Sequence, residues 1–97
     1  MNSEDITEQR SEQRIPVSLP VSIANTEGVT RDISLSGICF EAKGFFNLGE
    51  IVRFAVEFEN QGNNLTLNCS GEIVRLVNRQ DKVDVSVKII ESALKTF

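Results

Sequence analysis

The segment IVRFAVEF, residues 51–58, carries the clearest structural signal in this 97-residue chain. Its apolar side chains recur at every second position, at Val52, Phe54, Val56 and Phe58. A period of two places these side chains on one face of an extended strand. The segment is therefore expected to form a β-strand with one buried face.

Segments on both sides of residues 51–58 repeat this signal. Downstream, the turn residues ENQGNN lead to LTLNCSGEIVRLV (65–77), where Gly71 is expected to mark a bulge, and NRQDK leads to VDVSVKI (83–89). Upstream lie IPVSLPVSI (15–23), VTRDISL (29–35) and ICFEA (38–42). About six strands with turn signals between them predict an all-β fold, and the short chain favours a six-stranded antiparallel barrel over two open sheets.

The two ends of this strand region carry separate signals. Pro16 and Pro20 cannot donate a backbone hydrogen bond, so residues 15–23 are expected to form an edge strand or a bulged strand. In the closing segment IESALKTF, four apolar residues have helical spacing: Ile90, Ala93, Leu94 and Phe97. This spacing predicts a short C-terminal helix that covers one end of the barrel.

The composition is typical of one soluble domain. Hydrophobic residues make up 40% of the chain and charged residues 25%. No run approaches the ~18 consecutive apolar residues of a membrane span, and the polar start MNSEDITEQRSEQR contains no apolar secretory region. We expect a cytoplasmic protein without membrane insertion, in which residues 1–9 form a flexible arm and residues 10–97 form the domain.

Charge and residue types argue against several function classes. The net charge of −4 disfavours a nucleic-acid polymer as partner, because duplex binding relies on many Lys and Arg side chains. The chain has no His, and Cys39 and Cys69 lack CxxC partners, so neither a metal site nor a cofactor is predicted. No nucleophile and base stand together in the sequence, and we expect the protein not to be an enzyme.

Two arginines stand just before the first expected strand, in the sequence RSEQR. Their spacing puts Arg10 and Arg14 on the same side of either a helix or a strand. Two guanidinium groups together can bind phosphate oxygens or the acceptor edge of a guanine. They could equally be solvated arginines paired loosely with Glu8 and Glu12, and the residues alone leave both interpretations open.

A second polar motif, RDISLSG, ends the next expected strand. The alternation directs Thr30, Asp32 and Ser34 outward, and Val29, Ile33 and Leu35 toward the core. The Asp32 carboxylate can accept hydrogen bonds from a purine, and the Ser34 hydroxyl can donate or accept one. Gly37 permits either a positive φ or the close approach of a ligand. Asp, Ser and Gly are also ordinary turn residues, so turn formation is the alternative interpretation.

Together, the two motifs on a six-strand frame resemble the PilZ domain family. That family is marked by RxxxR followed by [D/N]xSxxG, and here RSEQR fills the first pattern and DISLSG the second. The later segments NLGEIVRFAVEF and GEIVR are also similar to the family's usual order. The resemblance extends over residues 10–90.

This resemblance implies a six-stranded PilZ-type barrel that binds the bacterial second messenger cyclic di-GMP. It implies that Arg10 and Arg14 grip guanine and phosphate, that Asp32 accepts from guanine N–H groups, and that Ser34 adds a hydrogen bond. It also implies that Gly37 allows close approach of the ligand.

The resemblance further implies how the signal is passed on. Ordering of the arm over the barrel would be read by a separate downstream protein. Gln9 is an additional site candidate, because the family residue before the first arginine influences whether one or two cyclic di-GMP molecules bind. Ser36, within the second motif, is another. The alternative is a PilZ-like adaptor that docks other proteins without the nucleotide, although such adaptors usually have broken motifs. The identity of the partner and the oligomeric state do not follow from the sequence.

Overall fold

Seven β-strands run through the part of the chain that the computed structural model describes, residues 12–24 and 26–96. They are β1 (Ile15–Pro16), β2 (Pro20–Ile23), β3 (Thr26–Ile33), β4 (Gly37–Ala42), β5 (Ile51–Asn60), β6 (Asn63–Arg79) and β7 (Lys82–Thr96). Every strand pairing is antiparallel. Within these described ranges there is no helix with the length and apolarity of a membrane crossing.

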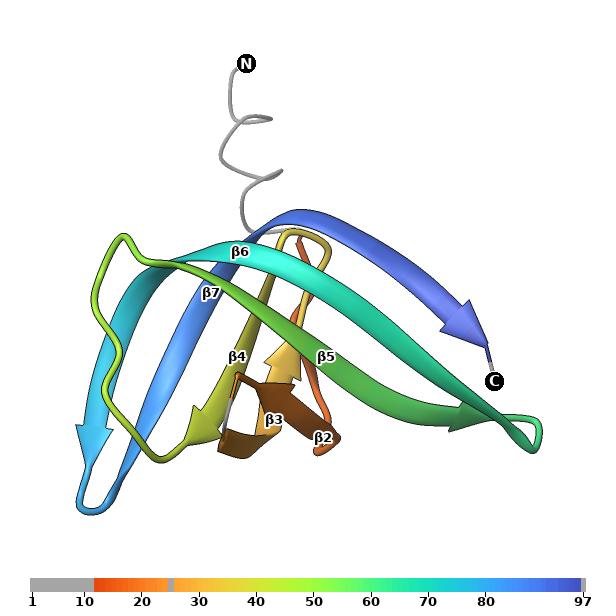
Figure 1. The fold of residues 1–97 in the computed structure, drawn as a ribbon, viewed down its shortest axis with the longest axis horizontal. Helices are drawn as coiled ribbons and strands as arrows, with labels where there is room; N and C mark the ends of the chain where they lie inside the picture. Colours follow the sequence, from red (N-terminus) through yellow and green to blue (C-terminus); the bar gives the residue numbers. More distant parts are fainter. Residues whose placement is uncertain (1–11, 25, 97) are drawn as a thin grey trace.

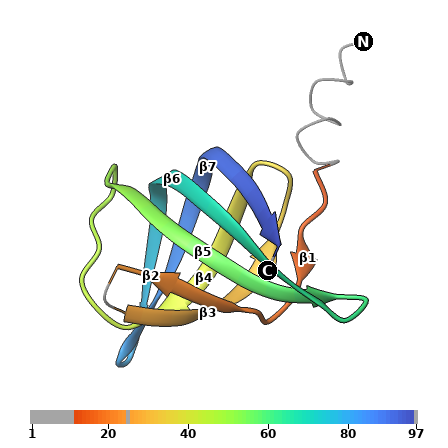
Figure 2. The same ribbon diagram turned by 45° about the vertical axis from the view of Figure 1, so that its right-hand side comes forward.

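Six of the strands close into a barrel, as the sequence predicts. Their order around the ring is β3, β2, β5, β6, β7 and β4, and β4 pairs again with β3 (Figures 1 and 2). The short strand β1 pairs with the end of β3, outside this ring. The wall made by β3, β4 and β7 therefore lies next to the segment that enters the barrel from the N-terminal side.

The barrel interior is filled by the alternating apolar residues of the strands. Phe40 lies at its centre, fully buried, and its ring centroid is 5.6 Å from that of Phe54. The other largest fully buried hydrophobic side chains are Ile73, Val21, Val56, Val85 and Val87. Burying each such side chain contributes about 1.5–3 kcal/mol, so this core holds the strands in register.

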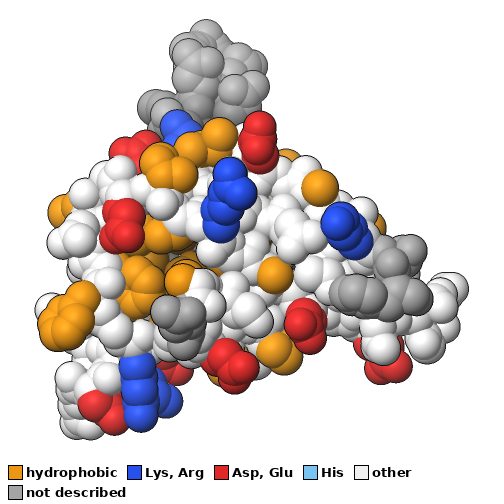
Figure 3. Space-filling model, in the orientation of Figure 1, with side chains coloured by type: hydrophobic (Ala, Val, Ile, Leu, Met, Phe, Trp, Pro, Cys, Tyr) orange, Lys and Arg blue, Asp and Glu red, His pale blue; other side chains and the backbone are white. Residues whose placement is uncertain are grey.

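The loop between β4 and β5, residues 43–50, lies over one end of the barrel. Its Phe46 ring packs edge-on against Phe40 at a centroid distance of 6.4 Å. Its other aromatic residue, Phe45, is completely exposed. Both line a pocket with Ile23 and Val52, and Figure 3 shows apolar side chains around a hollow on this face.

The chain leaves the ladder between β1 and β2, which is the irregularity that Pro16 and Pro20 predict. The buried side chain of Thr30 compensates for the break. Its hydroxyl accepts a hydrogen bond from the Leu19 N–H at 2.9 Å and donates one to the Val17 carbonyl oxygen. One hydroxyl thereby satisfies two backbone groups that the strand ladder does not pair.

A bulge at Arg31 reverses the alternation within β3. Thr30 lies opposite the buried Phe40, but the next paired residue, Asp32, lies opposite the half-buried Cys39. Thr30 therefore faces the interior, and Asp32, two positions later, faces outward. The expectation that Thr30 points outward is wrong, because the extra residue in the strand moves the outward phase to Asp32.

Leu35 is also placed differently from the expectation that it faces the core. It is 92% exposed, because β3 ends at Ile33 and Leu35 lies in the turn that leads to β4. In this turn the Ser34 N–H donates to the Gly37 carbonyl oxygen at 2.8 Å. The alternation of a strand does not extend into such a turn.

The predicted C-terminal helix is wrong, since β7 continues as a strand to Thr96. Strand β6 is 17 residues long, and its first half pairs with this end of β7, down to Leu65 opposite Thr96. The predicted bulge is present, because the register shifts between Ser70 and Gly71. A long partner strand thus outweighs the helical spacing of residues 90–96.

Candidate functional site

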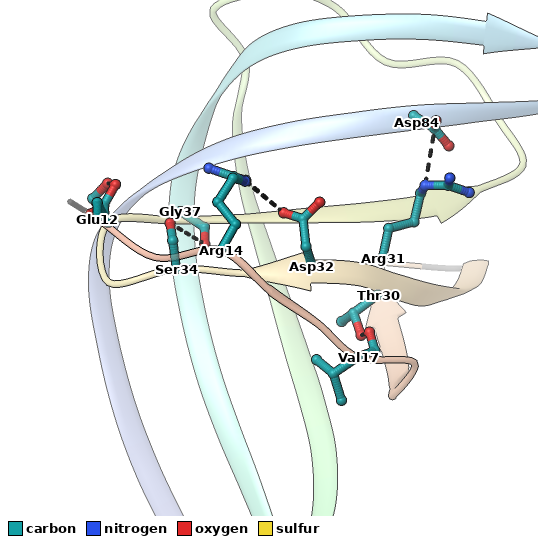
Figure 4. Close-up of polar contacts among 10 residues, drawn as sticks. Glu12, Arg14, Val17, Thr30, Arg31, Asp32, Ser34, Gly37 and Asp84 are labelled. Carbon is teal, nitrogen blue, oxygen red and sulfur yellow. Dashed lines mark hydrogen bonds and ion pairs between the residues drawn. The ribbon is translucent and has the colours of Figure 1, made fainter. Parts of the chain in front are cut away.

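Arg14 brings the first motif into contact with the second. It directly precedes β1, which pairs with β3 so that Pro16 lies opposite Asp32. The Arg14 Nε and Nη2 atoms lie 2.9 and 2.7 Å from Oδ1 of Asp32 (Figure 4). The two side chains remain 51% and 29% exposed. The ion pair is therefore accessible from the outside of the barrel.

Asp32 belongs to a row of polar side chains that crosses the barrel wall. It lies opposite Cys39 on β4, Cys39 lies opposite Ser86 on β7, and Ser86 lies opposite Arg75 on β6. The bulge at Arg31 is what places Asp32 in this row. Without the bulge, the Asp32 side chain would point into the barrel, as the Thr30 side chain does.

The turn from β3 to β4 is held by two hydrogen bonds within it and by two to its surroundings. The Ser34 hydroxyl donates to the Gly37 carbonyl oxygen at 3.3 Å, in addition to the backbone bond from the same residue. The Ile89 N–H donates to the Ser36 carbonyl oxygen at 2.8 Å. The Ser36 hydroxyl donates to Oε1 of Glu12 at 2.9 Å. These bonds tie the second motif both to β7 and to the segment just before β1.

Gly37 is required by the close approach of β4 to β7. Its φ is not positive, so it does not serve the left-handed region. A Cβ atom at this position would lie 2.8 Å from the Val87 carbonyl oxygen, closer than real Cβ atoms approach. The absence of a side chain is thus explained by packing within the barrel, without any ligand.

Three charged residues to which the sequence alone assigns no role converge beside this site. Arg79 Nε donates to Oδ2 of Asp84, and Arg31 Nε lies 3.7 Å from the same oxygen. The hydrogen bond that Arg79 donates to Asp84 raises the pKa of the Arg79 guanidinium. The Asp84 side chain is only 7% exposed, and its Oδ1 has no hydrogen-bond partner among the described residues.

This buried carboxylate holds Arg31 and Arg79 on the outer wall, and Arg31 is the neighbour of Asp32 in the chain. The outward phase of Asp84 could be predicted from the alternation of β7. The convergence of the three side chains could not, because it depends on which strands become neighbours.

The two cysteines do not provide reactive thiolates at this site. Both are free thiols, and burial raises the pKa of Cys39 and of Cys69. A raised pKa keeps a thiol protonated and poorly nucleophilic at neutral pH. In the described ranges, no group of three or more His, Cys, Asp or Glu side chains is arranged to hold a metal ion.

The described residues bring most of the predicted site together. Arg14, Asp32, Ser34 and Gly37 lie around one end of the β3–β4 turn, as Figure 4 shows, and Ser36 contacts the same entry segment. Arg10 and Gln9 lie outside the residues that the structure describes.

Comparison with known proteins agrees with the motif pattern and the barrel. A family model described as "PilZ domain" matches residues 8–96. The solved structure of the Bacillus subtilis inhibitor of motility (MotI/DgrA) is similar in fold, with a TM-score of 0.75 and 22% sequence identity. The match covers 88% of this chain but 44% of that one, so the present chain spans less than half of its length. No curated protein matches.

Proposed function

Because the chain belongs to the PilZ domain family, we propose that it is a cytoplasmic receptor for cyclic di-GMP that relays the signal to a protein partner and is not an enzyme. One observation carries the proposal. Arg14 of the RxxxR motif and Asp32 of the second motif meet on the outer wall, where both side chains are open to a ligand. The resemblance of the two motifs to the family pattern supports a role for these two positions in recognising guanine and phosphate.

The ligand would replace the ion pair with stronger contacts. An exposed ion pair such as Arg14–Asp32 contributes only about 0–1 kcal/mol. A hydrogen bond between a charged side chain and a ligand contributes about 1.5–3 kcal/mol. The Asp32 carboxylate would accept from guanine N–H groups, and the released Arg14 guanidinium would donate to a phosphate or to guanine. The exchange is favourable because two weak contacts give way to several stronger ones.

Neighbouring groups would complete the site. Arg10 would supply the second guanidinium of the motif, and the Ser34 hydroxyl would add a hydrogen bond. Arg31 and Arg79 place further positive charge on the same wall. An anionic ligand is thus accommodated locally, although the whole chain carries a net charge of −4.

A protein partner would read the state of this wall. The exposed Phe45 and the neighbouring Leu48, 65% exposed, give such a partner an apolar surface at one end of the barrel. The second candidate function, an adaptor that works without the nucleotide, would use the same surface. The intact motifs favour the receptor.

Calorimetric titration with cyclic di-GMP separates the two functions. We expect wild type to bind and Arg14→Ala to bind about tenfold or more weakly, because a charge-assisted hydrogen bond is lost. Arg53→Ala is the matched control, since Arg53 is exposed on β5, which does not pair with β3. Equal binding by wild type and Arg14→Ala would contradict the role of Arg14, and absence of binding by wild type would favour the adaptor.

A further inference from the structure

The second half of β7 forms a free edge of the barrel. Strand β4 pairs with β7 only as far as Gly37 opposite Lys88, followed by the bond from the Ile89 N–H to the Ser36 carbonyl. Among the described strands, β6 alone pairs with residues 91–96. Figure 1 shows this end of β7 at the border of the sheet. One side of the strand therefore presents backbone N–H and C=O groups without a strand partner.

Such an edge is a template for adding another strand, and its side chains favour addition. Ile90 and Leu94 are each 57% exposed. Proteins usually protect a long apolar edge with a bulge, a proline or a covering segment. The backbone of residues 89–96 is described throughout, and its pairing with β6 is regular except at the beginning. There the register shifts between Ser70, which lies opposite Glu91, and Gly71, which lies opposite Ile89.

The charged side chains along this edge form a self-complementary pattern, with an acidic residue toward one end and a basic residue toward the other. Glu91, Ala93 and Lys95 lie on one face of the strand, and Ser92 and Leu94 lie on the other. Glu91 and Lys95 are both exposed, and neither forms an ion pair with any residue in the described part of the chain. An acidic and a basic group therefore stand at equal distances on either side of Ala93.

We propose that β7 pairs antiparallel with β7 of a second copy of this chain, centred on Ala93. A two-fold symmetric pair of antiparallel strands places one residue opposite its own counterpart. With Ala93 at the centre, Glu91 lies opposite Lys95 of the second copy, and the symmetry repeats this pair. Centring the pair on Ser92 or on Leu94 would place Ala93 opposite one of the charges and lose both ion pairs.

This register also covers the exposed apolar side chain. Leu94 lies opposite Ser92 of the second copy and diagonally beside the second Leu94, within reach of contact across the new strand pair. The sheet would continue from one barrel to the next without an exposed edge. The free edge begins after Ile89, whose N–H donates to the Ser36 carbonyl oxygen in the β3–β4 turn. The dimer interface would therefore lie next to the proposed nucleotide site, but its contacts do not include the nucleotide.

Charge reversal on the full chain tests the register. By sedimentation velocity we expect wild type to form a dimer, with twice the 10.8 kDa mass of one chain. Glu91→Lys and Lys95→Glu should each weaken the dimer about tenfold, because like charges then face each other twice. The double variant restores opposite charges and should dimerise as wild type does. Glu27→Lys makes the same change in net charge as Glu91→Lys at an exposed position on β3, which does not pair with β7, and should have no effect.

Amide hydrogen exchange provides a second readout. Amides in residues 91–96 should become more protected as the protein concentration rises, while circular dichroism shows that each variant keeps its fold. A wild-type protein that stays monomeric up to roughly millimolar concentration would overturn the proposal, because a dimer weaker than that does not form a specific interface. So would single reversals that leave the dimer unchanged, or a double variant that does not recover.

Discussion

Arg14 and Asp32 are 18 positions apart in the chain, yet their side chains meet on the outer wall with an N···O distance of 2.7 Å. Two features of the backbone produce this contact. Strand β1 runs beside the end of β3, and the bulge in β3 turns Asp32 outward. The barrel itself therefore brings Arg14 of the first motif into contact with Asp32 of the second.

We expect Asp32→Ala to weaken binding of cyclic di-GMP about tenfold or more, because the guanine N–H groups lose a charged acceptor. The free energy of unfolding should change by less than about 1 kcal/mol, since the ion pair is exposed. Calorimetry and urea denaturation measure the two effects. Asp81→Ala, in the exposed turn between β6 and β7, is the control. Undiminished binding by Asp32→Ala would remove this carboxylate from the site.

Thr30→Val should destabilise the barrel by about 2 kcal/mol or more, because the change keeps the shape of the side chain but leaves two backbone groups unpaired. These groups are the Leu19 N–H and the Val17 carbonyl. Thr26→Val is the matched control, since its hydroxyl makes one exposed contact of 3.3 Å, to the Lys43 carbonyl. Urea denaturation should separate the two variants, and equal losses would refute the role given to Thr30.

Gly37→Ala should lower the free energy of unfolding by about 1–3 kcal/mol, as overpacked sites do. Its new methyl group would lie 2.8 Å from the Val87 carbonyl oxygen, and this backbone can yield only if β4 moves away from β7. Ser36→Ala, at an exposed position in the same turn, should change stability much less. If thermal denaturation gives the same midpoint for both variants, Gly37 is not required by packing.

The two thiols should react slowly with iodoacetamide in the folded protein and faster in urea at the same pH. Burial raises the pKa of Cys39 and of Cys69 in the folded state, so the unfolded chain releases these protons at lower pH. Their contribution to stability is complete below the ordinary thiol pKa and falls as the pH rises through the alkaline range. The Cys39→Ser, Cys69→Ser double variant should show a smaller alkaline loss. Equal alkylation rates with and without urea would contradict this burial effect.

The strand pattern could be predicted because each strand of a barrel buries one face. Residues 51–58 and 83–89 show this most clearly, and the glycine at position 71 marks the expected bulge. The bulge at Arg31 has no such mark, since no glycine or proline accompanies it. It arises from the pairing of β3 with β4, which a local pattern does not contain.

The helix predicted at the C-terminus is wrong for a related reason. The apolar residues there fit a helical repeat, but the length of β6 provides a strand partner for residues 91–96. The residues of the candidate site could be predicted from the resemblance of their spacing to the PilZ pattern, since each motif alone also fits a solvated surface or a turn. The group formed by Arg31, Arg79 and Asp84 could not, because Arg31 on β3 reaches Asp84 on β7 only after β4 has paired with both strands.

The most direct measurement is a titration of the ¹⁵N-labelled protein with cyclic di-GMP, followed by amide chemical shifts. If the nucleotide binds to the wall described above, the largest changes should lie in residues 12–16 and 32–37, and amides of β5 should change little. Saturating nucleotide that leaves residues 32–37 unshifted, or that shifts β5 instead, would contradict the proposed site.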